Sequence, residues 1–262
     1  MSGRWPYLPP RADALRHRLI FALDVDTPAE AERLVRLLAK EVGIFKIGKQ
    51  LFLAAGPEVV RMVLRHGADV FLDLKFHDIP HTVAKAGVAA ARLGVRFFDV
   101  HASGSFEMME RTHAEVTRAC RREGIRRPRI LAVTVLTSLD KGDLRRVGVA
   151  DEVEHQVVRL ARLARRAGMD GVVAAPLEIA RIRRACGRGF LIVTPGVRPA
   201  SAGLDDQKRV LTPEEAMRAG ADYLVLGRPI REARDPRGAV RDVVAEMARG
   251  YFAARLRPGV RA

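Results

Sequence analysis

Short apolar runs alternate with longer amphipathic segments from one end of the chain to the other. The apolar runs are rich in β-branched residues and have the lengths typical of buried strands, whereas the amphipathic segments repeat their apolar residues at helical spacing. Eight of the apolar runs are predicted to be strands, and they cover residues 18–25, 44–48, 68–75, 95–102, 129–137, 171–176, 191–197 and 223–230.

The segment of residues 28–43 shows how the predicted helices are delimited. Asp26 and Thr27 are suitable caps for its start, and a Pro follows them in the first turn. Gly43 is expected to close this helix. Comparable helical patterns cover residues 80–94, 105–124, 152–168 and 213–220.

Near-continuous apolar strands that alternate with helices predict a parallel sheet covered by helices. Eight such units without a break in composition favour an α/β fold, a single (β/α)8 TIM barrel with its site at the C-terminal ends of the strands. The expected organisation is an N-terminal arm at residues 1–17, a catalytic barrel domain at 18–250 and a C-terminal tail at 251–262. A doubly wound open sheet is the alternative, but the chain lacks GxGxxG after the first strand and GxxxxGK(S/T) anywhere.

Hydropathy and cysteine content narrow the class of protein. No apolar run approaches the roughly 18 residues needed to cross a bilayer, so a membrane protein is not expected. The N-terminal residues lack the apolar core and cleavage site of a signal peptide, which favours a cytoplasmic protein. Cys120 and Cys186 lie far apart and outside any CxxC motif, which argues against a zinc site and against a disulfide framework.

The formal charge of +15 invites a nucleic-acid interpretation, because Lys and Arg that neutralise phosphates dominate affinity for DNA and RNA. Seven of the 46 basic residues are Lys and the rest are Arg, and they are spread over many predicted helices without interleaved aromatic residues. This distribution is typical of a solvated Arg-rich surface. We therefore expect no nucleic-acid partner, although the charge is compatible with attraction of an anionic substrate.

Polar residues gather at the predicted strand ends, where a barrel collects its chemistry. Asp73 and Lys75 are two residues apart on one strand, so both side chains are expected to point into the barrel mouth. Asp24 and Lys46 end the first two strands and can face the same space. These four charges of alternating sign can form one hydrogen-bonded array, either as a site or as a salt-bridge network that only holds the barrel together.

Such an array suits proton delivery and carbanion stabilisation. A lysine held between carboxylates stays protonated, because opposite charges raise its pKa. It can then donate a proton or stabilise a developing negative charge on carbon. A neighbouring carboxylate can orient the lysine or repel a carboxylate of the substrate.

Seven stretches, in order along the chain, resemble the orotidine 5′-phosphate decarboxylase family. DLKFHDIPHT, residues 73–82, is similar to the family signature DxKxxDIPxT. The other similar stretches are FALDV, FKIGKQLF, VHASG, VTVLTS, TPGVR followed by DDQKRV, and VLGRPI, spread over residues 21–230. The resemblance implies decarboxylation of orotidine 5′-phosphate to uridine 5′-monophosphate and CO2, the last step of de novo pyrimidine synthesis.

The same resemblance assigns catalytic roles to individual positions. Lys75 resembles the family's proton donor to C6 of the pyrimidine, and Asp73 lies near the departing carboxylate. Lys46 and Asp78 complete a Lys-Asp-Lys-Asp array that stabilises the C6 carbanion. The resemblance implies no metal and no organic cofactor.

Substrate-binding positions also follow from the resemblance. Asp24, Lys46 and Asp78 correspond to contacts with the ribose hydroxyls, and Asp73 and Lys75 to contacts at the reacting carbon. The position that reads the pyrimidine edge corresponds to Thr137.

Phosphate binding is implied at Arg198, Gln207, Gly227 and Arg228. Physical reasoning agrees, because Gly227 lets the backbone approach an anion and Arg228 can grip it with a planar fork. Barrels frequently bind phosphate after the seventh and eighth strands. The connection at residues 196–211 is long, which predicts a lid that closes on the phosphate.

In the family, the segment corresponding to Asp78, Ile79 and Thr82 reaches the neighbouring subunit's site, so a homodimer with shared active sites is implied. The chain departs from the family pattern at His81, where Asn is usual, and at Ser105, where a second Gly is usual. Neither residue belongs to the charged array.

Three alternative functions stay open at this stage. A related family of sugar-phosphate decarboxylases and aldolases uses magnesium, but it has an acidic ligand where this chain has Lys46, whose charge repels a metal. A non-catalytic nucleotide-phosphate sensor and an RNA-binding protein are the other two.

His77 and His81 have the spacing of a metal pair, but Pro80 argues against a regular helix through both.

Overall fold

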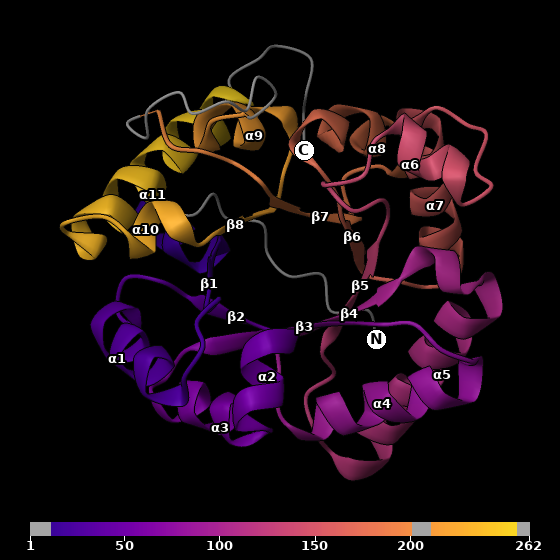
Figure 1. Ribbon diagram of the computed structural model, residues 1–262, viewed down its shortest axis with the longest axis horizontal. Coiled ribbons are helices and arrows are strands. Elements are labelled where there is room, and N and C mark those ends of the chain that lie inside the picture. Colours follow the sequence, from indigo (N-terminus) through magenta and orange to yellow (C-terminus); the bar gives the residue numbers. More distant parts are fainter. Residues whose placement is uncertain (1–11, 201–210, 256–262) are drawn as a thin grey trace.

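Eight parallel strands form a closed barrel in the computed structural model, which describes residues 12–200 and 211–255 (Figure 1). The strands pair in sequence order, and β8 pairs with β1 to close the barrel. Their bounds are β1 Leu19–Ala22, β2 Ile44–Gly48, β3 Asp69–Phe76, β4 Phe97–His101, β5 Arg129–Val133, β6 Gly171–Val173, β7 Leu191–Pro195 and β8 Tyr223–Leu226. The predicted (β/α)8 TIM barrel is confirmed.

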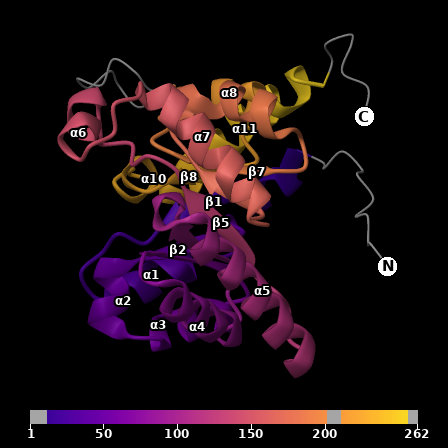
Figure 2. The same cartoon turned by 90° about the vertical axis from the view of Figure 1, so that its right-hand side faces the viewer.

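Helices surround the barrel, and most of them connect one strand to the next (Figure 1). The α-helices are α1 Pro28–Leu38, α2 Lys49–Ala55, α3 Glu58–Arg65, α4 Pro80–Arg92, α5 Phe106–Glu123, α6 Lys141–Arg146, α7 Val153–Arg166, α8 Ile179–Cys186, α9 Pro213–Ala219, α10 Arg228–Arg231 and α11 Pro236–Ala253. Three short 3-10 helices are η1 Ala12–Arg18, η2 Ala102–Gly104 and η3 Pro176–Glu178. In the side view of Figure 2, α2, α6 and α10, which follow the carboxyl ends of their strands, lie toward the same side of the molecule.

The core has two parts, because successive side chains of a strand point to opposite faces. The smaller part fills the barrel interior and consists of Ile20, Ala22, Ile44, Phe71, Phe97, Leu131, Val193 and Val225. The larger part lies between the strands and the helices and includes Phe21, Phe45, Leu72 and Phe98. Both faces of the strands are therefore buried, which explains why the strands read as continuous apolar runs.

Some element ends differ from the predicted ones. Thr27 caps α1 as expected, since its hydroxyl accepts a hydrogen bond from the Glu30 backbone N–H at 3.2 Å. The helix ends at Leu38, however, rather than at Gly43. Gly43 instead lets two backbones approach, because a Cβ there would lie 2.7 Å from the Cα of His17.

The fifth and eighth strands are shorter than predicted, since β5 ends at Val133 and β8 at Leu226. Residues 228–230, which were expected to end the last strand, belong instead to the short helix α10, Arg228–Arg231. Pro229 lies in the first turn of this helix, a position that needs no backbone N–H.

The two ends of the described chain pack against the barrel. Leu15 of η1 lies within the range expected as an N-terminal arm, and it is completely buried in the larger core. Tyr251 of α11 lies at the start of the expected C-terminal tail and is buried as well.

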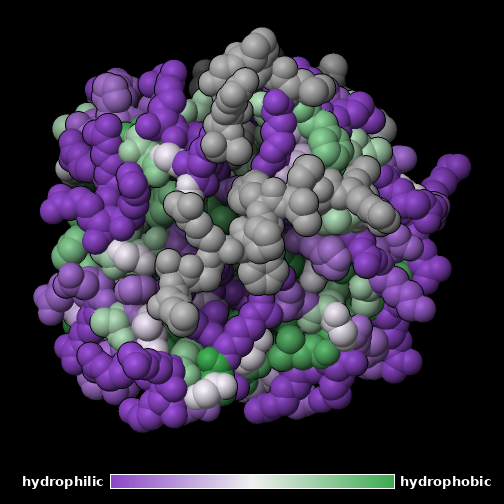
Figure 3. Space-filling view, turned by 180° about the vertical axis from the view of Figure 1, so that it is seen from behind, coloured by the Kyte–Doolittle hydropathy of each residue, from purple (hydrophilic) through white to green (hydrophobic). Residues whose placement is uncertain are grey.

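Hydrophilic side chains dominate the face shown in Figure 3, which is seen from behind relative to Figure 1, and the hydrophobic side chains there are scattered among them. Several arginines of the helices pair with nearby carboxylates, as Arg36 does with Glu32 and Arg92 with Glu123. Within the two described stretches, no helix combines the length and apolar character needed to cross a bilayer.

Candidate active site

Charged side chains lie next to the apolar layer inside the barrel, two residues further toward the carboxyl ends of the strands. On β2, Lys46 follows Ile44 on the inner face, and on β3, Asp73 follows Phe71 in the same way. Since inward positions recur every second residue, the strands that bury the inner core also deliver these charges to the mouth of the barrel. The site is thus built on strands and not on loops.

Four of the charges form an unbroken line of ion pairs. Lys46 Nζ lies 3.0 Å from Asp24 Oδ1 and 3.1 Å from Asp73 Oδ2, and Lys75 Nζ pairs with Asp73 Oδ1. The line therefore runs Asp24, Lys46, Asp73, Lys75, with alternating sign. The side chains of Lys46 and Asp73 are only 12% and 11% exposed. Such buried charges are tolerable because each of them has an opposite charge beside it.

The environment keeps the two central members of this line ionised. Burial by itself would lower the pKa of Lys46, but the carboxylates of Asp73 and Asp24 outweigh burial and raise this pKa above its ordinary value. Burial would raise the pKa of Asp73, but Lys46, a hydrogen bond with Asp99 and Lys75 together lower it. The ammonium of Lys46 and the carboxylate of Asp73 thus lie side by side at the mouth of the barrel.

The backbone is irregular at Lys75. Its φ is +50°, in the left-handed region, and the pairing between β3 and β4 shifts register between Leu72 and Phe76. A non-glycine residue in this region costs on the order of 1 kcal/mol, and such strain is common at functional sites. The bulge turns the Lys75 side chain toward Asp73 and the cavity beside it.

Asp99 of β4 is one of the polar residues at the strand ends, to which neither the pattern nor the resemblance assigned a role, and the structure places it beside Lys75. It is completely buried, and its Oδ1 accepts a hydrogen bond from the Lys75 backbone N–H at 2.8 Å. The charge of Asp73 acts on it and, after burial, raises its pKa. The signal that could have identified it is its spacing, because Asp99 follows the inner-core residue Phe97 by two positions, as Asp73 follows Phe71.

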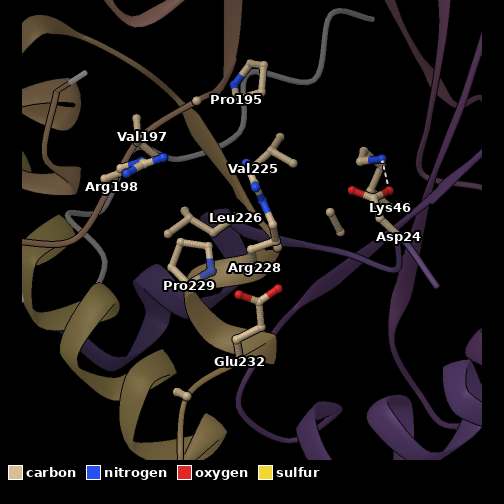
Figure 4. A pocket seen from close by; sticks show the side chains of 14 residues that line it. Asp24, Lys46, Pro195, Val197, Arg198, Val225, Leu226, Arg228, Pro229 and Glu232 are labelled. Carbon is tan, nitrogen blue, oxygen red and sulfur yellow. Dashed lines mark hydrogen bonds and ion pairs between the residues drawn. The ribbon is translucent and has the colours of Figure 1, made fainter. Parts of the chain in front are cut away.

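A cavity of about 500 Å³ opens beside the charged line, at the ends of β1, β7 and β8 (Figure 4). Arg198 and Arg228 lie on its β7–β8 side, and the Lys46–Asp24 pair lies on the opposite side. Gly227 lines the same cavity, and a Cβ there would lie 3.3 Å from that of Ala22. Two arginine side chains, together with a glycine whose backbone an anion can approach closely, are suited to bind a phosphate here.

A second cavity of about 240 Å³ lies above the inner core. Lys46, Asp73 and Lys75 line one part of it, and Leu136 and Thr137 line another. Its walls are mostly apolar, and they can accept a flat ring with Thr137 at the edge. Thr137 lies four residues beyond β5 and reaches the cavity from a connection, not from the strand on which it was expected.

The remaining predicted residues are not brought to this site within one chain. Asp78, Ile79 and Thr82 are exposed at the start of α4, and Asp78 Oδ1 accepts a hydrogen bond from the Ile79 backbone N–H at 2.6 Å. The fourth phosphate position, Gln207, lies outside the described residues, as does most of the 196–211 connection.

Two histidines stack at the edge of the charged line. The rings of His77 and His101 have centroids 5.3 Å apart, and burial, followed by the charges of His77 and Lys49, lowers the pKa of His101 to about 4. His81 is separated from His77 by the start of α4 at Pro80. In the part of the chain that the structure describes, no three His, Cys, Asp or Glu side chains converge as a metal site.

Ser105 has a left-handed backbone, with φ of +111°, a region that favours glycine. The departure from the expected second Gly after HASG therefore has a conformational cost. Its hydroxyl offsets part of this cost, because it caps α5 by accepting a hydrogen bond from the Met108 backbone N–H at 3.1 Å.

Comparison with known proteins agrees with this architecture. The model of the orotidine 5′-phosphate decarboxylase / HUMPS family matches residues 17–243. An orotidine 5′-phosphate decarboxylase of Pelobacter propionicus is 59% identical over 238 residues, which cover 91% of this chain and 98% of that protein. The enzyme of the same name from Geobacter sulfurreducens is 56% identical, with 91% and 99% covered.

A solved structure gives the same result for the fold. The crystal structure of orotidine 5′-phosphate decarboxylase from Lactobacillus acidophilus superposes with a TM-score of 0.79 at 36% identity. The match covers 88% of this chain and 99% of that one. The range that the family model matches, residues 17–243, includes all eight strands of the barrel.

Proposed function

This chain belongs to the orotidine 5′-phosphate decarboxylase / HUMPS family, and we propose that it decarboxylates orotidine 5′-phosphate to uridine 5′-monophosphate and CO2. The enzyme is a carboxy-lyase. The observation that carries the residue roles is the unbroken line of ion pairs from Asp24 to Lys75 beside a cavity with two arginines. Because this reaction belongs to pyrimidine synthesis, we place the enzyme in the cytoplasm.

Lys75 is the group that we assign to proton transfer. When the bond between C6 and the carboxylate breaks, CO2 leaves and the electron pair stays on C6. The Lys75 ammonium then gives its proton to C6, and the resulting amine takes up a proton from solvent, so that the protein returns to its starting charge. Its pairing with Asp73 fixes the ammonium at one place before the substrate arrives.

Asp73 and Lys46 create the field around the reacting carbon. Asp73 is ionised and lies beside the position of the departing carboxylate, so the charge that disappears as CO2 leaves is the one that Asp73 repels. Lys46 holds Asp73 in place and, with Asp24, is available to the ribose hydroxyls. This preorganised charge is how a protein can stabilise a carbanion by electrostatics.

The phosphate group is assigned to the cavity between β7 and β8. Arg198, Gly227 and Arg228 line it, and Gln207 is proposed to join them. The phosphate is remote from C6, so its binding energy can be used to hold the pyrimidine against Lys75. Thr137 is then positioned to read the pyrimidine edge.

The enzyme is proposed to act as a homodimer with shared sites. Ile79 is 66% exposed in the single chain, which is unusual for a large apolar residue beside a site, and Asp78 and Thr82 are exposed next to it. A partner subunit that covers Ile79 would receive Asp78 in its own site, where this carboxylate would complete the Lys-Asp-Lys-Asp array.

Subunit mixing tests the shared site. Lys75→Ala and Asp78→Ala homodimers should both be inactive, but after unfolding and joint refolding about a quarter of the sites should be intact, because half of the dimers are mixed and each mixed dimer has one complete site. A mixture that stays as inactive as its components would contradict the shared site.

The magnesium-dependent alternative requires a cation between carboxylates that already hold a lysine. Lys46 Nζ lies within 3.1 Å of both Asp24 and Asp73, so its positive charge opposes a metal at this place. The test is to follow the ultraviolet absorbance of orotidine 5′-phosphate with purified enzyme in excess chelator. Full turnover is expected, whereas activity that the chelator abolishes and magnesium restores would favour the alternative.

A further inference from the structure

Asp99 lies directly behind the charged line and lines neither of the two cavities. It is 0% exposed and is held on the inner face of β4, where Leu131 of β5 lies opposite to it. Oδ1 accepts the hydrogen bond from the Lys75 backbone N–H, but no donor among the described residues reaches Oδ2. A buried carboxylate oxygen without a donor is costly, so this atom requires an explanation.

The neighbour of Asp99 supplies the explanation. Asp73 and Asp99 both lie on the inner face of paired strands, two residues beyond the inner-core residues Phe71 and Phe97, and the charge of Asp73 acts on Asp99. A hydrogen bond between two carboxyl groups requires that one of them carries a proton. Burial, followed by the charge of Asp73, raises the pKa of Asp99 well above its ordinary value, whereas the pKa of Asp73 is lowered. The proton therefore belongs to Asp99.

The charge balance of the site agrees with this assignment. The line of ion pairs contains two ammonium groups, Lys46 and Lys75, and two carboxylates, Asp24 and Asp73. An ionised Asp99 would add a negative charge at a fully buried position in excess of the ammonium groups that its own chain supplies, and a neutral Asp99 avoids this excess.

We propose that Asp99 is a positioning residue of this enzyme, a protonated carboxylic acid that accepts a hydrogen bond from the Lys75 backbone with one oxygen and donates one to Asp73 with the other. The first bond holds Lys75 in its left-handed conformation, and the second fixes the rotation of the Asp73 carboxylate. Asp99 thereby keeps the proton donor and its partner in register without touching the substrate. This role rests on the proposed decarboxylation.

Two substitutions separate this role from others. Asp99→Asn keeps an acceptor for the Lys75 N–H and provides a donor for Asp73, so kcat should stay within about threefold of the wild type. Asp99→Ala removes both bonds, and kcat should fall about 100-fold, because hydrogen bonds to charged groups are lost, while KM changes less than about threefold.

A matched control is Thr194→Val on β7. Thr194 is also 0% exposed, and its hydroxyl has no partner among the described residues, but it lies on the opposite face of β7 from the inner-core residue Val193. Its removal should leave kcat unchanged. Circular dichroism and binding of uridine 5′-monophosphate show whether Asp99→Ala is folded.

Infrared spectroscopy tests the proton without any substrate. At neutral pH the difference spectrum between the wild-type enzyme and Asp99→Asn should show the carbonyl stretch of a protonated carboxylic acid, shifted in D2O. The inference is overturned if no such band is found, if Asn is as harmful as Ala, or if Ala leaves kcat unchanged. Should the wild type not turn over orotidine 5′-phosphate at all, the proposed function fails, and the infrared band still reports on Asp99 by itself.

Discussion

At the ends of β1, β2 and β3 the charged side chains are paired with one another, whereas at the ends of β7 and β8 they face a cavity. Lys46 has carboxylates within 3.1 Å on two sides. Arg228, in contrast, forms no ion pair with any carboxylate of the described residues and lies in the first turn of a short helix after its strand. The two halves of the mouth thus hold their charge in different ways.

The difference fits the two tasks proposed for these residues. A group that acts on a reacting carbon must be fixed before the substrate arrives, so it lies on a strand and is neutralised by its neighbours. A group that binds a phosphate receives its counter-charge from the ligand, so Arg228 can lie on a connection and needs no carboxylate of the described residues beside it. Substitutions in the two halves should therefore fail in different ways.

The largest effect is expected from Lys75→Ala. Loss of the proton donor and of a preorganised positive charge should lower kcat by at least about 1,000-fold, while the second ion partner of Asp73, Lys46, preserves the fold. Steady-state kinetics with orotidine 5′-phosphate measure this, and Lys85→Ala, which removes a surface pair with Glu115, is the control. A kcat within tenfold of the wild type would remove Lys75 from the mechanism.

Arg228→Ala should show the opposite kinetic pattern. Removing one charge-assisted phosphate contact should raise KM by about 10- to 100-fold, with a smaller change in kcat, because the contact is remote from the reacting carbon. The exposed Arg234, which lies near α10 but does not line the cavity, serves as the control when changed to Ala. An Arg228 variant with unchanged KM would show that the phosphate binds elsewhere.

A third pair of variants compares the stability of the two halves. Lys46→Met leaves the buried Asp73 with one cation instead of two and should lower the free energy of unfolding by about 2 kcal/mol. Arg228→Met removes a charge that no carboxylate of the described chain pairs with, so it should change this free energy by less than about 0.5 kcal/mol. Urea unfolding at neutral pH measures both, and equal effects would contradict the distinction between the halves.

The sequence predicted the fold because the apolar pattern of the strands is repeated eight times. It also predicted that Asp24, Lys46, Asp73 and Lys75 lie together, since all of them follow from strand ends and a period of two. The bulge at Lys75 could not be predicted, because it depends on a contact with Asp99, which is 24 residues away.

The ends of the strands were harder to predict than their existence. β5 stops at Val133 although apolar residues continue after it, and Thr137 therefore reaches the cavity from a connection. The apolar residues of this connection line the cavity and do not pair in the sheet. In the sequence, an apolar run that lines a cavity cannot be distinguished from one that continues a strand. The role proposed for Asp78 is of another kind, because it would depend on a second chain.

The smallest effect concerns pH, and it should again separate the two halves. His101 lies at the charged half, where burial, His77 and Lys49 lower its pKa from 6.5 to about 4. The unfolded chain therefore binds a proton at higher pH than the folded one, and the free energy of unfolding decreases as pH falls from about 6.5 toward 4. Because His101 is only partly buried, we expect this residue to account for about 1 kcal/mol of the loss between pH 7 and pH 5. His101→Gln should abolish that part of the loss in urea unfolding, whereas the exposed His155→Gln should not. If the two variants lose stability equally with falling pH, the neutral state of His101 is not part of what the charged half requires, and the pH dependence must come from its carboxylates alone.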